Sequence, residues 1–235
     1  MEKNSDMKIS FKIKTNESLA NAIRRGTGLV PTMAIDEVEI SRNDSALYDE
    51  TLAHRIGLIP IKMDKSWKED TVLKFKLDSK KENVYSGEIK GDFELVYEKI
   101  PLTLLSPNQE LKIKGKTKMG TGREHAKFSP GIILYRDITE ISLDKEFEKE
   151  IKNIFPGIEI KDKGNKVILK DDNEKTVLDF CEGLAQRKKK KVEVTETGEF
   201  LFTVESFGQM KAEEIFKKSV EILEKELKGI SKKIK

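Results

Sequence analysis

The strongest constraint on the fold is a strand-and-helix pattern that occurs at both ends of the 235-residue chain. Near the start, residues 7–13 alternate apolar and polar side chains, and Leu19, Ala22 and Ile23 then form one apolar stripe at helical spacing. Near the end, residues 200–204 alternate again before a helix predicted over 211–228. These two half-layers predict one domain whose sequence is interrupted by another.

The predicted C-terminal helix has a broad apolar side. This side contains Ala212, Ile215, Phe216, Val220, Ile222, Leu223 and Leu227. The opposite side carries Glu-before-Lys pairs four residues apart, each of which stabilises a helix by roughly 0.2–0.5 kcal/mol. Because the apolar side is wider than one neighbouring sheet needs, we expect part of it to face another subunit.

The first helix is followed by a break and an irregular strand. Gly26, Gly28 and Pro31 disfavour continuation of the first helix. At the start of the same helix, Asn16 or Thr15 is the expected cap. The alternation over residues 33–40 slips in phase, which predicts a bulge near residues 36 and 37.

The middle of the chain changes character twice. After a helix predicted over 48–56, short strands are expected at 72–77, 84–89, 93–105, 111–114 and 132–135. Residues 147–186 are then predicted to form a helix, two strands and a second helix.

The predicted fold class is α+β. A discontinuous α/β domain is formed by residues 1–46 and 192–235, a mostly β insert by 47–144 and a small α+β module by 145–191.

Composition excludes several functional classes. Hydrophobic and charged residues each make up 37%, which is typical of a thin core completed against partners or of surface ion-pair networks. The formal net charge is only +3, so a dedicated polyanion-binding protein is not indicated.

The single cysteine, Cys181, excludes an internal disulfide and a multi-thiolate metal site, and we expect a buried, inert thiol. Without an N-terminal apolar segment or a spanning run, we expect a cytoplasmic protein.

The most suggestive chemical motif is the segment containing Gly120, Gly122, Arg123 and His125, which ends at Pro130. It lacks the spacing of a Walker loop and the third glycine of a dinucleotide fingerprint, so a structured loop is the favoured interpretation. A nucleotide-using enzyme built on this loop is the alternative. The second histidine, His54, is distant in sequence, and the two form no ligand or proton-shuttle motif.

Two basic segments have open interpretations. Residues 187–191 form the only sustained basic run, which suits a solvated helix end but also a free-standing nucleic-acid-binding module. Arg24 and Arg25 follow the apolar helix face and precede the glycine break. They are either a plain surface pair or interface contacts, for which the planar guanidinium is well suited.

Four blocks carry a family resemblance: residues 16–40, 52–61, 120–130 and 202–208 with the helix that follows. They resemble the RNA polymerase α-subunit family, in its archaeal and eukaryotic branch, and are most similar to the archaeal D subunits. The blocks occur in family order over nearly the whole chain, so the resemblance is more specific than any single motif.

The resemblance implies a non-catalytic assembly subunit of DNA-directed RNA polymerase with a discontinuous dimerisation domain. Its partner would be subunit L in a heterodimer, joined by subunits N and P, and this platform would dock the second-largest and largest catalytic subunits. DNA would be met only through the complex. The catalytic Mg²⁺ and the zinc would belong to other subunits.

Residue roles follow from the same resemblance. The heterodimer interface would use Leu19, Ala22, Ile23, Phe216, Val220, Leu223 and Leu227, and Arg25 with Arg24 would contact a large subunit. Many archaeal relatives bind iron–sulfur clusters in a ferredoxin-like module, but a cubane cluster needs about four thiolates and this chain has only Cys181. We therefore expect no iron–sulfur cluster and no zinc in this chain. Gly26 and Gly28 also depart from the aliphatic residues usual in relatives.

Overall fold

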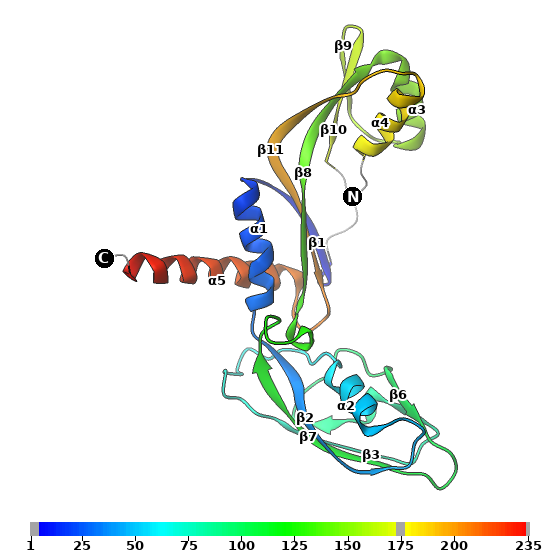
Figure 1. The fold of residues 1–235 in the computed structure, drawn as a ribbon, viewed down its shortest axis with the longest axis vertical. Helices are drawn as coiled ribbons and strands as arrows, with labels where there is room; N and C mark the ends of the chain where they lie inside the picture. Colours follow the sequence, from blue (N-terminus) through cyan, green and yellow to red (C-terminus); the bar gives the residue numbers. More distant parts are fainter. Residues whose placement is uncertain (1–4, 173–176, 234–235) are drawn as a thin grey trace. The chain divides into compact units, whose positions relative to one another are not determined.

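The computed structural model describes residues 5–172 and 177–233 and shows a mixed α/β protein with mostly antiparallel sheets (Figure 1). The chain divides into two compact units. Unit 1 contains Ser10–Ala22 and Leu134–Thr203, and unit 2 contains Ser5–Ile9, Ile23–Ile133 and the chain from Val204 onward. Each unit has its own buried apolar cluster.

A five-stranded sheet brings the two ends of the chain together. Its order is β1 (Lys8–Lys14), β11 (Glu193–Ser206), β8 (Gly131–Asp144), β10 (Lys166–Asp171) and β9 (Ile160–Lys163). The first and last strands of the chain are therefore neighbours, and β10 runs antiparallel to both β8 and β9. Helices α1 (Glu17–Gly26) and α5 (Ala212–Lys233) follow the two terminal strands, as the sequence pattern predicts.

The core of unit 1 lies between β8, β10 and two helices, α3 (Glu148–Ile154) and α4 (Val177–Arg187). The helices lie close to the predicted positions, although residue 176, the predicted start of the second, lies outside the described residues. Cys181 is fully buried in this cluster, and burial raises the pKa of its thiol to about 11. It is the inert, buried thiol that the sequence predicts.

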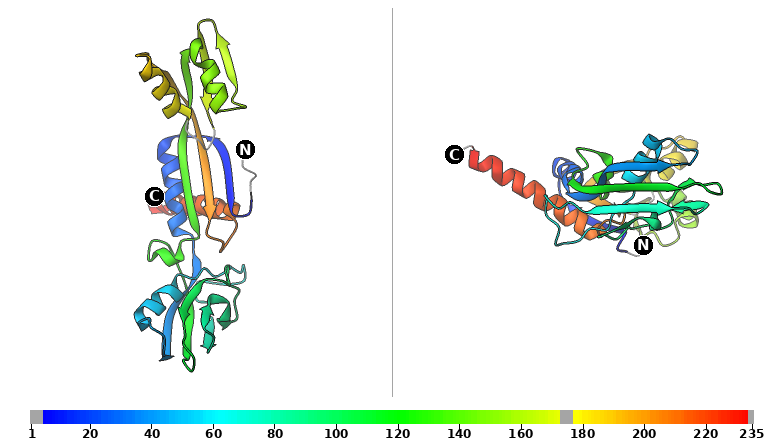
Figure 2. Two further views of the ribbon diagram at one scale, coloured as in Figure 1. Left: turned by 90° about the vertical axis from the view of Figure 1, so that its right-hand side faces the viewer. Right: turned by 90° about the horizontal axis from the view of Figure 1, so that it is seen from below.

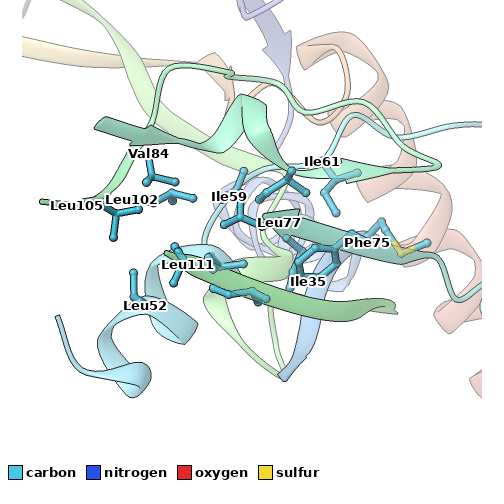
Figure 3. Packing of buried hydrophobic residues seen from close by; sticks show 14 residues of the cluster. Ile35, Leu52, Ile59, Ile61, Phe75, Leu77, Val84, Leu102, Leu105 and Leu111 are labelled. Carbon is cyan, nitrogen blue, oxygen red and sulfur yellow. The ribbon is translucent and has the colours of Figure 1, made fainter. Parts of the chain in front are cut away.

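Unit 2 is built on a four-stranded sheet with the order β2 (Thr32–Asn43), β7 (Leu111–Gly120), β3 (Lys74–Ser79) and β5 (Lys90–Gly91). Helix α2 (Asp49–Gly57) contacts β2, and a two-stranded sheet pairs β4 (Asn83–Tyr85) with β6 (Pro101–Leu104). The apolar side chains of these elements point toward one another in one continuous cluster (Figure 3). Leu52 and Ile56, predicted on one face of α2, are fully buried.

Two details of the sequence-based prediction are resolved here. The pairing of β2 with β7 shifts register between Ile35 and Glu37, which confirms the predicted bulge. The strand predicted over residues 93–105 is wrong, because only Pro101–Leu104 is a strand. The hydroxyl of Ser86 donates to the Tyr97 carbonyl at 2.7 Å and accepts from the Ile100 amide at 3.1 Å. The Gly87 amide also donates to the Glu98 carbonyl at 2.8 Å, so a side chain and single backbone bonds hold this segment outside a regular ladder.

Strand pairing also joins segments that the sequence assigned to different domains. β2 comes from the predicted discontinuous domain and pairs with β7 of the predicted insert. β8 begins in the predicted insert and lies beside β11 in the five-stranded sheet. The predicted domain boundaries at 46, 144 and 191 stay a prediction.

Candidate functional site

Helices α1 and α5 approach most closely at a single glycine. A Cβ atom added to Gly26 would lie only 2.8 Å from the carbonyl oxygen of Ser219. Ser219 is fully buried, and its hydroxyl donates to the Ile215 carbonyl at 2.8 Å and lies 3.4 Å from the Thr27 hydroxyl. A 3-10 turn at Thr27–Leu29 then ends the helix. The glycine break predicted from the sequence is thus the point where one helix crosses the other.

The start of α5 is held by a tight turn after β11. Gly208 has a φ of +102°, a backbone conformation that favours glycine, and its amide donates to the Ser206 hydroxyl at 2.9 Å. The Ala212 amide donates to the Asp6 carbonyl at 2.8 Å, and the side chains of Ala212 and Ile215 are fully buried. The first turns of α5 are therefore buried against the rest of the chain.

The broad apolar side of α5 separates into two stripes. Ala212, Ile215 and Ser219 are buried, whereas a second stripe at alternating four- and three-residue spacing is half-buried at Phe216 and Leu223 and exposed at its other members. This outer stripe consists of Phe216, Val220, Leu223, Leu227 and Ile230. Val220 is 37% exposed, Leu227 56% and Ile230 55%, and every residue from Glu224 to Lys233 is exposed.

The last turns of α5 extend beyond the elements that its first turns contact (Figure 2). Sequence reasoning missed Ile230 because it ended the helix near residue 228, although the three-residue spacing from Leu227 is a signal for it. An exposed apolar stripe on a helix end marks a place where another polypeptide can pack.

The predicted apolar stripe of α1 faces two ways. Ile23 is only 7% exposed and Ala20 is fully buried, so they belong mainly to the chain's own core. Leu19 is 42% exposed and Ala22 is half-buried. A partner can therefore reach Leu19 far more easily than Ile23. The cap at the start of this helix is Asn16, whose carboxamide oxygen accepts from the Leu19 amide at 2.9 Å.

Arg24 and Arg25 are exposed in the last turn of α1, directly before Gly26. Cations are favoured there because the C-terminal end of a helix carries partial negative charge. Within residues 5–172 and 177–233, no carboxylate forms an ion pair with Arg25. Its guanidinium is thus available to another polypeptide.

The loop from Gly120 to Pro130 connects several elements of unit 2. The Arg123 amide donates to the Gly28 carbonyl at 2.9 Å, and the Phe207 amide donates to the Pro130 carbonyl at 2.9 Å. His125 accepts from the Lys127 amide through its Nδ1 at 3.1 Å. The loop therefore bonds to the 3-10 turn after α1 and to the turn between β11 and α5.

The same loop has no open phosphate cradle. A Cβ at Gly120 would meet the Phe128 ring at 2.7 Å, and one at Gly122 would meet the Ser129 hydroxyl at 2.6 Å. The Thr121 amide donates to the Glu124 carboxylate at 3.1 Å, so an anionic side chain already occupies that donor. Phosphate binding requires a group of backbone amides that no carboxylate occupies. This loop presents no other such group of amides. This geometry favours the structured loop over the nucleotide-binding interpretation.

A lysine beside this loop stabilises the bulge in β2. Lys127 donates through Nζ to the Ile35 carbonyl at 3.0 Å and to the Asp36 carboxylate at 2.8 Å. Its side chain is only 14% exposed. The hydrogen bond from Lys127 is the main reason that the pKa of Asp36 lies below its usual value.

Two lysines of the basic run at residues 187–191 are paired within unit 1. Lys190 forms ion pairs with Asp144 and Glu146, and Lys188 lies 3.7 Å from Glu146. The ammonium of Lys188 also lies 4.8 Å from the centre of the Phe147 ring. Since its own acidic neighbours bind these lysines, the run favours a packed helix end over a nucleic-acid site.

Among the described residues, no group of three or more His, Cys, Asp or Glu side chains is arranged to hold a metal ion. None of the helices in the described part of the chain is both long and apolar enough to cross a membrane.

Comparison with known proteins identifies the family. The family model described as "RNA polymerase Rpb3/Rpb11 dimerisation domain" matches residues 11–227. The DNA-directed RNA polymerase subunit Rpo3 of Pyrococcus furiosus is 32% identical over 95% of this chain and 91% of its own length. The Rpo3 subunit of Archaeoglobus fulgidus is 33% identical over 97% of this chain and 94% of its own length. The chain therefore belongs to the family of archaeal RNA polymerase Rpo3 subunits, which carries the Rpb3/Rpb11 dimerisation domain.

Proposed function

We propose that the chain is a non-catalytic assembly subunit of DNA-directed RNA polymerase, which forms a heterodimer through α1 and α5. The observation that carries this proposal is the exposed C-terminal part of the outer stripe of α5, at Leu227 and Ile230. Leu227 and Ile230 are more than half exposed on a helix whose first turns are firmly packed. The family model, whose description names a dimerisation domain, covers residues 212–227 of this helix.

The partner we propose is subunit L, with an apolar layer of its own. Fully burying a Leu or Ile side chain stabilises by about 1.5–3 kcal/mol, so covering the exposed halves of Leu227 and Ile230 contributes about 2–3 kcal/mol in total. Leu19, Ala22, Phe216, Val220 and Leu223 would extend the contact, with Ile23 contributing little because it is already buried. An obligate interface of this kind buries about 2,000 Å² or more.

The wider assembly is proposed on the same basis. Arg24 and Arg25 would contact a large catalytic subunit, and subunits N and P would join the heterodimer. The loop containing Gly120, Gly122 and Arg123 would hold the first helix at the angle that this assembly needs, because it bonds to Gly28. The catalytic Mg²⁺ and the zinc would reside in other subunits, and this chain would carry no cofactor and meet DNA only through the complex.

The test is co-expression of subunit L with the double variant Leu227→Glu and Ile230→Glu. We expect heterodimer affinity to fall by about 30- to 150-fold, the equivalent of about 2–3 kcal/mol. Because both side chains are exposed, the free energy of unfolding of the isolated chain should change by less than about 0.5 kcal/mol. Size-exclusion chromatography with light scattering measures the complex.

The matched control is the double variant Val72→Glu and Leu104→Glu. These side chains are 55% and 65% exposed, and they lie in unit 2 away from α5 in the sequence. The control should assemble normally. Assembly of the α5 variant at wild-type affinity, or a stable monomer of the unmodified chain beside micromolar subunit L, would overturn the proposal.

A further inference from the structure

A second surface of unit 2 has a strongly biased charge. Along β3 and β7, Phe75, Leu77 and Ile113 point into the core, so the alternate residues face outward. The register places Lys74 opposite Lys116 and Lys76 opposite Lys114. The outward set, called here the lysine face, consists of Lys74, Lys76, Lys90, Lys112, Lys114, Lys116 and Lys118.

Four members of the lysine face have acidic neighbours. Lys116 pairs with Glu37 at 2.9 Å, Lys76 with Asp78 at 3.3 Å, Lys112 with Glu110 at 2.9 Å and Lys118 with Glu124 at 3.8 Å.

The other three, Lys74, Lys90 and Lys114, have no carboxylate within ion-pair distance in the described part of the chain. They line one open depression together with Lys76 and a single carboxylate residue, Asp92. Gly91 and Gly115, which lack side chains, line the same depression. Four lysines and one aspartate leave an excess of positive charge at this place on the sheet.

We propose that this depression binds an acidic segment of a partner protein. An extended peptide places every second side chain about 6.6–6.8 Å apart, the same spacing that separates Lys74 from Lys76 along β3. Two or three carboxylates of such a segment can therefore meet Lys74, Lys90 and Lys114 together. The surface is distinct from the outer stripe of α5 and does not depend on the heterodimer proposal.

A nucleic-acid backbone fits this surface less well. Glu37 and Glu39 lie opposite Lys116 and Lys114 on β2, so they would oppose a duplex that carries one charge per about 1.7 Å. Single-stranded binding uses exposed aromatic side chains for stacking, whereas Phe75, the aromatic residue of this strand, is buried. An extended peptide can carry its few carboxylates at the unpaired lysines alone, where the nearby opposing charges are Glu39, opposite Lys114, and Asp92 in the lining of the depression.

The test uses the full-length chain and a fluorescein-labelled peptide of about twelve residues with alternating Glu and Ser, whose span matches the strands. Fluorescence anisotropy measures binding at about 50 mM salt, where surface charges are weakly screened. The triple variant Lys74→Gln, Lys90→Gln and Lys114→Gln should weaken binding by about tenfold, because three exposed ion pairs are lost.

The control triple variant Lys149→Gln, Lys161→Gln and Lys163→Gln removes the same charge from exposed sites in unit 1. It should bind the peptide as the unmodified chain does, and the single variant Lys114→Gln should show an intermediate loss. Equal losses in both triple variants, no binding by the unmodified chain, or tighter binding of a DNA duplex than of the peptide would each overturn the proposal.

Discussion

Gly26 offers the sharpest test of how the two helices are held. Its backbone is helical, with φ −57° and ψ −26°, so Gly26→Ala by itself should stabilise the helix by up to about 1 kcal/mol. The new Cβ would lie 2.8 Å from the Ser219 carbonyl, a backbone atom that cannot rotate away. Relieving such overpacking costs about 1–3 kcal/mol. We therefore expect a net destabilisation of about 0–2 kcal/mol.

The comparison variant is Gly183→Ala in α4, where an added Cβ meets no atom within 4 Å. This change should stabilise by about 0.5–1 kcal/mol, because the helix gains propensity without a clash. The free energy of unfolding, measured in urea, should thus differ between the two variants by about 1–3 kcal/mol. Gly26→Ala should also weaken the heterodimer, since α1 must move relative to α5. Equal stabilisation by both substitutions would refute the inferred close approach.

Two further outcomes are expected. Lys127→Met should destabilise by about 1.5 kcal/mol at neutral pH, the lower end for a charged hydrogen bond, because it leaves Asp36 unpaired. The pKa of Asp36 is lowered by folding, so its contribution to stability is complete above about pH 4 and is lost as the pH falls through the folded pKa. The free energy of unfolding in urea should therefore fall less steeply with decreasing pH below pH 4 for Lys127→Met than for the unmodified chain. Cys181 should resist thiol reagents in the folded protein and react only after unfolding, because burial raises its pKa to about 11; rapid labelling of the folded chain would contradict this burial.

Features that depend on near neighbours in the chain are those that the sequence determines best. The bulge between Ile35 and Glu37 is visible as a phase slip, and the Asn16 cap as a residue type before a helix. The buried pair Leu52 and Ile56 follows from helical spacing. Each of these is decided by backbone geometry over a few residues, which local sequence specifies.

The exposure of the proposed interface residues was only partly predictable. Helical spacing groups Leu19 with Ile23, but only the packing of the chain shows that one is 42% and the other 7% exposed. The two stripes of α5 were likewise merged into one broad side. Which stripe is covered depends on elements distant in sequence, such as Asp6, whose carbonyl accepts from the first residue of α5.

Tertiary structure alone decided the role of two residue groups. Gly26 is a departure from a family pattern in the sequence, and it becomes a crossing point only because Ser219, near the other end of the chain, lies 2.8 Å from its would-be Cβ. In the sequence, the lysine face is visible only as two separate alternating strands, each with one solvent-exposed side. It becomes one charged surface because β3 and β7 are paired and, among the described residues, no carboxylate lies within ion-pair distance of Lys74, Lys90 or Lys114. Sequence specifies which way a side chain faces along its own strand, whereas pairing over long distances specifies what it faces.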